Sequence, residues 1–141
     1  MAVISGMPSR VDSAQEGIGW MDWREARFVE NTNLINKKAW DAYQEDYFRF
    51  QLMARPNYFE FFANGGVDWQ GEDHMIDMVG DVDGLELLDT CCACDAVQAF
   101  SWHNMGARVT ACDIAPKAIE IARANAVRMG LGLRFIVADM Q

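Results

Sequence analysis

The chain of 141 residues is predicted to have an α/β fold, in which helices alternate with the strands of a parallel sheet. Three apolar runs, residues 84–89, 106–113 and 133–139, each end in an aspartate. Such runs are typical of buried parallel strands, and the segments between them are long enough for crossover helices. The carboxyl-terminal part therefore predicts a β-α-β-α-β unit, the first half of a Rossmann-like domain.

The helix between the second and third strands has the clearest boundaries. Pro116 stands near its expected start, and Gly130 follows directly after its expected end. Apolar residues recur along it at the spacing of one helix face, the stripe expected to cover a parallel sheet. These residues are Ile119, Ala122, Ala126 and Met129. We therefore expect this helix to act mainly as scaffold.

Residues 1–83 have a different character, because they are rich in aromatic side chains and in helix-like spacing. Residues 1–19 contain Pro, Gly and Ser without periodicity and are expected to form a flexible arm. Residues 20–83 are expected to form an aromatic-rich helical region that acts as a lid or an interface. Its main helix is predicted over residues 36–53 and ended by Pro56. One face of this helix is aromatic, with Trp40, Tyr43, Tyr47 and Phe50.

The acidic strand ends point to a binding site. Asp89, Asp113 and Asp139 are expected at the carboxyl ends of neighbouring parallel strands, where open α/β sheets bind their ligands. Carboxylates at this edge suit sugar hydroxyls, an amine or an ammonium group. The sequence therefore predicts a ligand site along this edge of the sheet.

At these positions the chain resembles the class I S-adenosylmethionine-dependent methyltransferases, above all their small-molecule branch. Residues 109–126 follow the family's second motif closely, and residues 130–131 and 135–139 continue it. The resemblance covers residues 84–141, and residues 36–43 are similar to the family's amino-terminal helix. It implies S-adenosylmethionine as cofactor and a small molecule as methyl acceptor.

The resemblance also implies a role for each acidic strand end. Asp89 matches the acid that supports the methionine portion of the cofactor, and Asp113 matches the acceptor of hydrogen bonds from the ribose hydroxyls. Ile114 matches the residue beside the adenine, and Asp139 and Met140 match the pair at the adenine edge. No catalytic residue can be assigned from the sequence.

The loop after the first strand departs from the family pattern, because the three expected glycines fall at Cys91, Ala93 and Asp95. Glycine reaches positive φ without strain and lets the backbone approach a ligand closely. Cys91 and Ala93 are still expected to contact the cofactor. Asp95 has two compatible interpretations: it repels the cofactor's carboxylate, or it caps the amino end of the next helix.

In the family the sheet continues beyond three strands, whereas this sequence ends after the third. We therefore expect a truncated Rossmann-like region, with residues 85–88 left as an exposed apolar edge. Such an edge predicts a partner, either a second copy in a homo-oligomer or a longer methyltransferase in a hetero-oligomer.

The amino-terminal aromatic residues allow two interpretations. In the family, helices in this place form a lid, so Trp20, Trp23, Tyr43 and Tyr47 are candidates to bind the substrate. Aromatic stripes at helical spacing are, however, more often core or interface packing. Residues 58–62 carry further aromatic side chains that could contact the expected partner.

Composition excludes some classes of function. The formal net charge of −9, with scattered Lys and Arg, argues against nucleic-acid binding. No apolar run is long enough to span a membrane, and residues 1–10 do not resemble a signal peptide, so a cytoplasmic location is expected. Cys91, Cys92 and Cys94 lack the spacing of a structural zinc site, so packing is favoured over a metal.

Three functions remain open. In the first, the chain is a methyltransferase subunit that acts on a small molecule within an oligomer. In the second, it is a non-catalytic partner that stabilises or activates a full-length methyltransferase. In the third, the fold has been adapted to a reaction other than methylation. The substituted loop favours the second, whereas the intact motifs around Asp113 and Asp139 favour the first.

Overall fold

The computed structural model describes residues 26–140, and its elements follow the predicted order. The helices α1 (Ala26–Ala54), α2 (Tyr58–Ala63) and α3 (His74–Val79) precede the sheet. The β-α-β-α-β unit then consists of β1 (Glu86–Thr90), α4 (Val97–Asn104), β2 (Arg108–Asp113), α5 (Pro116–Met129) and β3 (Arg134–Val137). The predicted α/β class, a Rossmann-like half preceded by helices, is confirmed.

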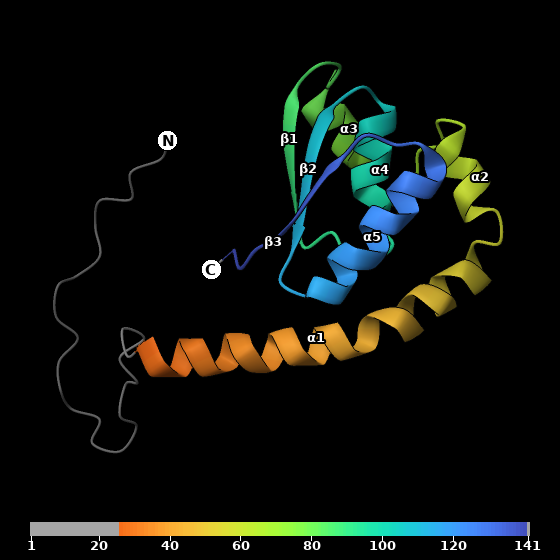
Figure 1. The fold of residues 1–141 in the computed structure, drawn as a ribbon. Helices are drawn as coiled ribbons and strands as arrows, with labels where there is room; N and C mark the ends of the chain where they lie inside the picture. The colour runs from red at the N-terminus through yellow and green to blue at the C-terminus, as the bar shows by residue number, and fades with distance from the viewer. Residues whose placement is uncertain (1–25, 141) are drawn as a thin grey trace, which may run out of the picture.

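The sheet is parallel, with the strand order β1-β2-β3. Figure 1 shows α4 and α5 beside the same face of the sheet, and α1 crossing near the carboxyl ends of the strands. The central strand β2 is the most buried of the three. Within residues 26–140, β1 lies at an edge, and Leu85 and Leu88 are 53% and 54% exposed. The predicted apolar exposure of this edge is therefore present in the described part of the chain.

The core between the helices and the sheet is aromatic. Tyr58 and Phe62 of α2 are fully buried and stack edge-on or tilted against Phe100 of α4, which in turn contacts Phe135 of β3. The suggestion that residues 58–62 contact a partner is therefore wrong for Tyr58 and Phe62. These side chains hold α2 to the sheet layer instead.

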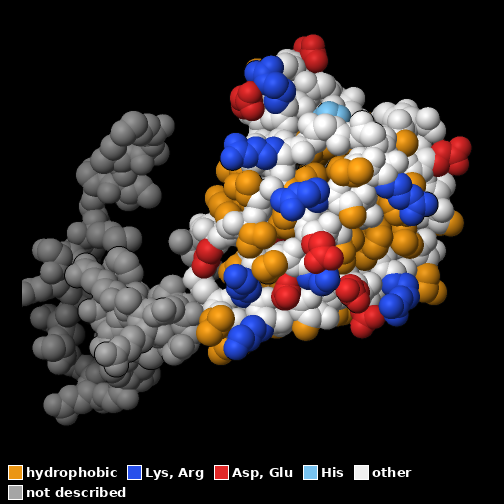
Figure 2. Space-filling model, viewed as in Figure 1, with side chains coloured by type: hydrophobic (Ala, Val, Ile, Leu, Met, Phe, Trp, Pro, Cys, Tyr) orange, Lys and Arg blue, Asp and Glu red, His pale blue; other side chains and the backbone are white. Residues whose placement is uncertain are grey.

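The helix α5 matches its predicted bounds and buries the predicted apolar stripe. Its amino end is fixed by α1, because the carboxylate of Asp41 accepts a hydrogen bond of 2.7 Å from the backbone N–H of Lys117. The ammonium of Lys117 also lies 3.5 Å from Glu45 of α1 and 3.0 Å from Glu120. Figure 2 shows acidic and basic side chains interspersed along the lower face, where α1 and α5 lie. These contacts set the position of α1 relative to the sheet.

The helix α1 is longer than predicted and faces the core differently. Its buried or half-buried residues Gln44, Phe48 and Leu52 face the rest of the molecule. On its aromatic face, Trp40, Tyr43 and Phe50 are half or more exposed, so the core interpretation of this stripe is wrong. None of the helices within residues 26–140 is long and apolar enough to cross a membrane.

Candidate functional site

Three adjoining cavities lie beside α1 at the carboxyl ends of the strands, and we refer to them together as the groove. The first, which we call the acidic cavity, has a volume of about 230 Å³. The central cavity is about 380 Å³ and shares Tyr47, Cys91 and Ala93 with it. The outer cavity is about 420 Å³ and shares Ile114 with the central one. The groove is thus large enough for a nucleotide-sized ligand.

The loop between β1 and α4 keeps a glycine-like backbone although it contains no glycine. Cys91 and Ala93, which stand at the family's first two glycine positions, have φ angles of 64° and 53°. A third positive φ, 43°, falls at Ala96, directly after Asp95. A left-handed conformation costs a residue with a Cβ about 1–2 kcal/mol. The surrounding structure must therefore hold this loop in place.

Side chains from three helices supply that support. The backbone N–H of Cys94 donates to the side-chain oxygen of Gln44 on α1, at 3.2 Å. The backbone carbonyl of Cys94 accepts from the amide of Asn125 on α5, at 3.4 Å. The hydroxyl of Tyr58 on α2 donates to the backbone carbonyl of Asp95. All of these polar groups are buried, so each hydrogen bond avoids an unsatisfied donor or acceptor.

Asp113 ends β2 and joins two loops. One carboxylate oxygen accepts from the backbone N–H of Ala93 at 3.0 Å, and the other accepts from the N–H of Ala115 at 2.9 Å. The residue is 9% exposed and borders the central cavity together with Ile114. Each carboxylate oxygen has a second lone pair, so the geometry leaves acceptor capacity for a ligand hydroxyl. Asp113 and Ile114 therefore lie together at the central cavity.

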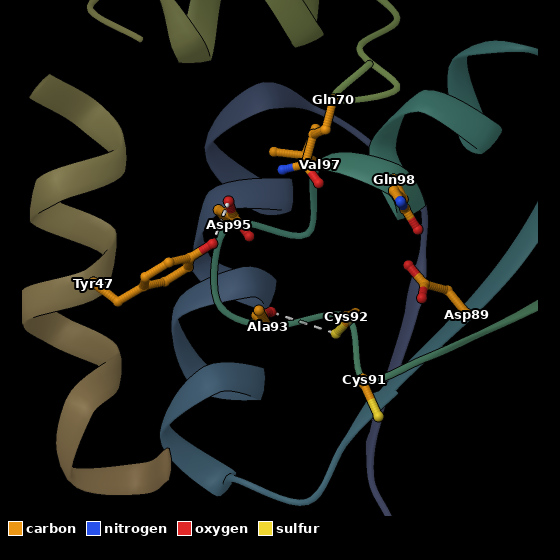
Figure 3. Close-up of a pocket in the computed structure, with 9 residues that line it drawn as sticks. All are labelled: Tyr47, Gln70, Asp89, Cys91, Cys92, Ala93, Asp95, Val97 and Gln98. Atoms are coloured by element: carbon orange, nitrogen blue, oxygen red, sulfur yellow. Dashed lines mark hydrogen bonds between the residues drawn. The ribbon is translucent and has the colours of Figure 1, made fainter. Parts of the chain in front are cut away.

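Asp89 near the end of β1 borders the acidic cavity, as Figure 3 shows. Its Oδ2 atom is buried and has no hydrogen-bond partner within the described structure. Burial, and then the nearby charge of Asp113, raise the pKa of Asp89 to about 6. A carboxylate oxygen without a partner beside a cavity can accept a hydrogen bond from a ligand's N–H or ammonium group.

Asp95 is a second carboxylate at the acidic cavity (Figure 3). It is 3% exposed, and burial raises its pKa, although the charge of Arg55 opposes this shift. The hydroxyl of Tyr47 lies 3.5 Å from one of its oxygens, a long contact. The interpretation as helix cap is wrong, because the N-cap of α4 is Ala96 and no side chain caps it. The other interpretation, a fixed negative charge at the site, remains.

The outer cavity contains the predicted adenine-edge residue Asp139, which lies beyond the end of β3. Its carboxylate accepts a hydrogen bond of 2.8 Å from the amide of Asn33 on α1. Lys37 on the same helix and Ile114 also border this cavity. Met140 is 52% exposed and is not among the residues that line it.

Two of the four aromatic residues predicted to bind the substrate are described, and one of these two lies in the groove. Tyr47 borders both the acidic and the central cavity. Tyr43 is exposed on α1 and packs against Tyr47, with ring centroids 5.9 Å apart, but it lines none of the three cavities. Trp20 and Trp23 lie outside the described residues.

Trp40, Gln44 and Gln98 line the groove but were not predicted as site residues. The signal for Trp40 was present, because it stands seven residues before Tyr47 and so shares a helix face with it. No sequence signal distinguishes Gln44 or Gln98, because a polar residue in a helix is usually exposed.

The four cysteines are free, and only Cys91 is exposed. Cys92, Cys94 and Cys112 are buried, and burial raises the pKa of each thiol. The predicted packing role of these small side chains is thereby confirmed for the three buried residues. Within residues 26–140, no three His, Cys, Asp or Glu side chains are grouped as ligands for a metal ion.

Comparison with solved structures gives partial likenesses. A structure concerning the conversion of a disulfide bond into a thioacetal group during echinomycin biosynthesis is 33% identical, with a TM-score of 0.42, over 49% of this chain and 29% of that one. A Thermoplasma acidophilum protein is 34% identical, with a TM-score of 0.39, over 47% and 35% of the two chains. A TehB-like SAM-dependent methyltransferase from Corynebacterium glutamicum is 25% identical, with a TM-score of 0.46. That match covers 70% of this chain and 46% of the other.

This chain thus spans less than half the length of each of those three proteins. No curated protein matches it significantly. Residues 88–141, which contain the loop, β2, α5 and β3, match the family model of a methyltransferase domain. This is the segment in which the sequence motifs resemble the class I enzymes. Residues 88–141 are therefore similar to a methyltransferase domain.

Proposed function

We propose that this chain is a subunit of an S-adenosylmethionine-dependent methyltransferase that acts on a small molecule within an oligomer. The observation that carries the proposal is the groove, which brings Asp89, Asp113 and Asp139 to one edge of the sheet. The cofactor's ammonium, ribose and adenine are of a size to occupy the acidic, central and outer cavities in turn. Bound there, the cofactor supplies a methyl group on an activated sulfonium.

The residues of this chain have separate tasks in that proposal. Asp89 accepts hydrogen bonds from the ammonium, and Asp113 accepts them from the ribose hydroxyls. Ile114 and Trp40 offer apolar surface for the adenosine, since both border the central cavity. Such groups bind and orient the cofactor, and positioning with exclusion of water can provide much of the rate of methyl transfer.

A second function is favoured by one specific observation. The loop that approaches the cofactor carries Cβ atoms at Cys91 and Ala93 and a buried carboxylate at Asp95. Both features oppose close binding of the cofactor's amino-acid end. In this alternative, the chain is a non-catalytic subunit that stabilises or activates a longer methyltransferase.

The test is calorimetric titration of the purified chain with S-adenosylmethionine, combined with measurement of its mass in solution. The proposal expects saturable binding that Asp113→Asn weakens at least tenfold. Asp46→Asn is the matched control, because Asp46 is an exposed carboxylate of α1 that lines none of the three cavities. If the chain forms a stable oligomer but no form of it binds S-adenosylmethionine, the result would instead support the non-catalytic function.

A further inference from the structure

We infer that the acidic cavity takes an ammonium group with no carboxylate beside it, so that the groove prefers a decarboxylated adenosyl ligand over S-adenosylmethionine itself. The inference rests on the proposed function, because it places the adenosine in the central and outer cavities. It goes further by assigning a chemical class to the part of the ligand that enters the acidic cavity.

The first support is the charge of the cavity. Asp89 and Asp95 both border it, and none of its lining residues is Lys, Arg or His. The Oδ2 atom of Asp89 is buried and unpartnered in the described structure, so it is free to accept from a ligand. Two carboxylates without a lining cation favour a positively charged occupant.

The second support is the position of Asp95 at the start of α4. A helix amino end attracts a ligand carboxylate through its free N–H groups and its dipole. Here Asp95 stands directly before the N-cap residue Ala96 and is 3% exposed, so its carboxyl group is buried close to this helix end. A carboxylate of S-adenosylmethionine that approached this end of α4 would therefore meet the protein's own acid.

The third support concerns Arg55, the cation that compensates the negative charge of Asp95. Arg55 is the basic residue whose charge acts most strongly on Asp95. Its guanidinium forms an ion pair of 3.0 Å with Asp68 and also donates to Gln51. Arg55 does not line the acidic cavity and is already paired, so it does not provide a site for a ligand carboxylate.

The charges of the two ligands make the preference measurable. S-adenosylmethionine carries a sulfonium, an ammonium and a carboxylate, whereas its decarboxylated form keeps only the two cations. Like charges a few ångströms apart in a partly screened site repel by enough to change affinity at least about fivefold. We therefore expect decarboxylated S-adenosylmethionine to bind at least about fivefold more tightly than S-adenosylmethionine.

The experiment measures the Kd of three ligands for the full chain by calorimetry: S-adenosylmethionine, its decarboxylated form, and methylthioadenosine, which lacks the amino-acid end. A fivefold or greater preference for the decarboxylated form supports the inference, and a smaller or reversed preference overturns it. Binding of S-adenosylmethionine without that preference would leave the proposed function intact. Failure of all three ligands to bind would overturn both.

Two variants test which residue causes the ligand preference. Asp95→Asn keeps the side-chain shape and should reduce the preference to less than twofold, whereas an unchanged preference would overturn the role of Asp95. Asp89→Asn should weaken the two ammonium ligands equally and leave their ratio unchanged. Asp46→Asn removes an exposed carboxylate and should change neither the affinities nor their ratio. If Asp95→Asn does not fold, the wild-type ratio alone decides the inference.

Discussion

The carboxylate of Asp113 accepts a hydrogen bond of 3.0 Å from the backbone N–H of Ala93, and so joins the end of β2 to the loop after β1. This contact lies beside a residue with a φ angle of 53°, at a position where the family has glycine. The residue predicted to bind the ribose thus also stabilises the strained loop. A change at this position will affect both stability and binding.

Replacing Asp113 by Ala should lower the free energy of unfolding by about 3 kcal/mol, because the N–H groups of Ala93 and Ala115 lose a charged acceptor. It should also abolish affinity for S-adenosylmethionine. Urea unfolding and calorimetry measure the two effects. Asp139→Ala is the matched comparison, since Asp139 is exposed and should affect adenosine binding with little loss of stability. Unchanged affinity in Asp113→Ala would refute its place in the site.

Strain in the loop can be tested at Cys91, which is exposed and has a φ angle of 64°. Cys91→Gly should raise the free energy of unfolding by about 1 kcal/mol, because glycine adopts this conformation without a Cβ clash. Cys91→Ala removes the thiol but keeps the Cβ, so it should change stability by less than about 0.5 kcal/mol. Equal effects of the two variants in urea unfolding would contradict the strain.

Much of this fold could be predicted from local sequence signals. Pro116 and Gly130 mark the bounds of α5, and the apolar runs mark the three strands. The orientation of α1 could not be predicted in the same way. Its aromatic face suggested core packing, but the buried Gln44 faces the protein because its side chain binds the backbone of Cys94. Such a buried polar contact depends on tertiary structure that periodicity does not report.

The candidate site was predictable to a different degree. Asp89 and Asp113 lie where parallel strands end, so their convergence followed from topology. The positive φ of Ala96 could not be predicted, because a residue with a Cβ rarely adopts a left-handed conformation. The burial of Asp95 at the cavity could not be predicted either, because an aspartate is usually exposed.

The contact between α1 and α5 should contribute measurably to stability. Asp41 accepts from the backbone N–H of Lys117 and acts as a cap supplied by another helix, because Ala115 at the N-cap has no capping side chain. Asp41→Ala should cost about 1 kcal/mol in urea unfolding. Asp46→Ala removes a carboxylate of the same helix that forms only an exposed pair with Arg49, and should cost less than about 0.5 kcal/mol. Similar losses in both variants would argue against the capping contact.

The half-buried carboxylate of Asp89 should make the free energy of unfolding and the ligand affinity depend on pH in opposite directions. Its pKa is raised to about 6 in the folded protein, whereas an unfolded aspartate has a pKa of about 3.9. The folded state therefore binds more protons between about pH 4 and pH 6, and the contribution of Asp89 to stability falls as the pH rises through this window. Asp89→Asn should then be more stable than the wild type at pH 7, on the order of 1 kcal/mol, and equal to it near pH 4.

Ligand binding should reverse this trend, because an ammonium group in the acidic cavity favours the ionised form of Asp89. Affinity for decarboxylated S-adenosylmethionine should therefore increase as the pH rises from 5 to 7, and binding at pH 6 should release protons. Calorimetry at pH 6 in buffers of different ionisation enthalpy measures that release. Asp89→Asn should abolish it, while Asp46→Asn should leave it unchanged, because Asp46 lies outside the acidic cavity. Proton release that persists in Asp89→Asn would place the coupled group elsewhere in the groove.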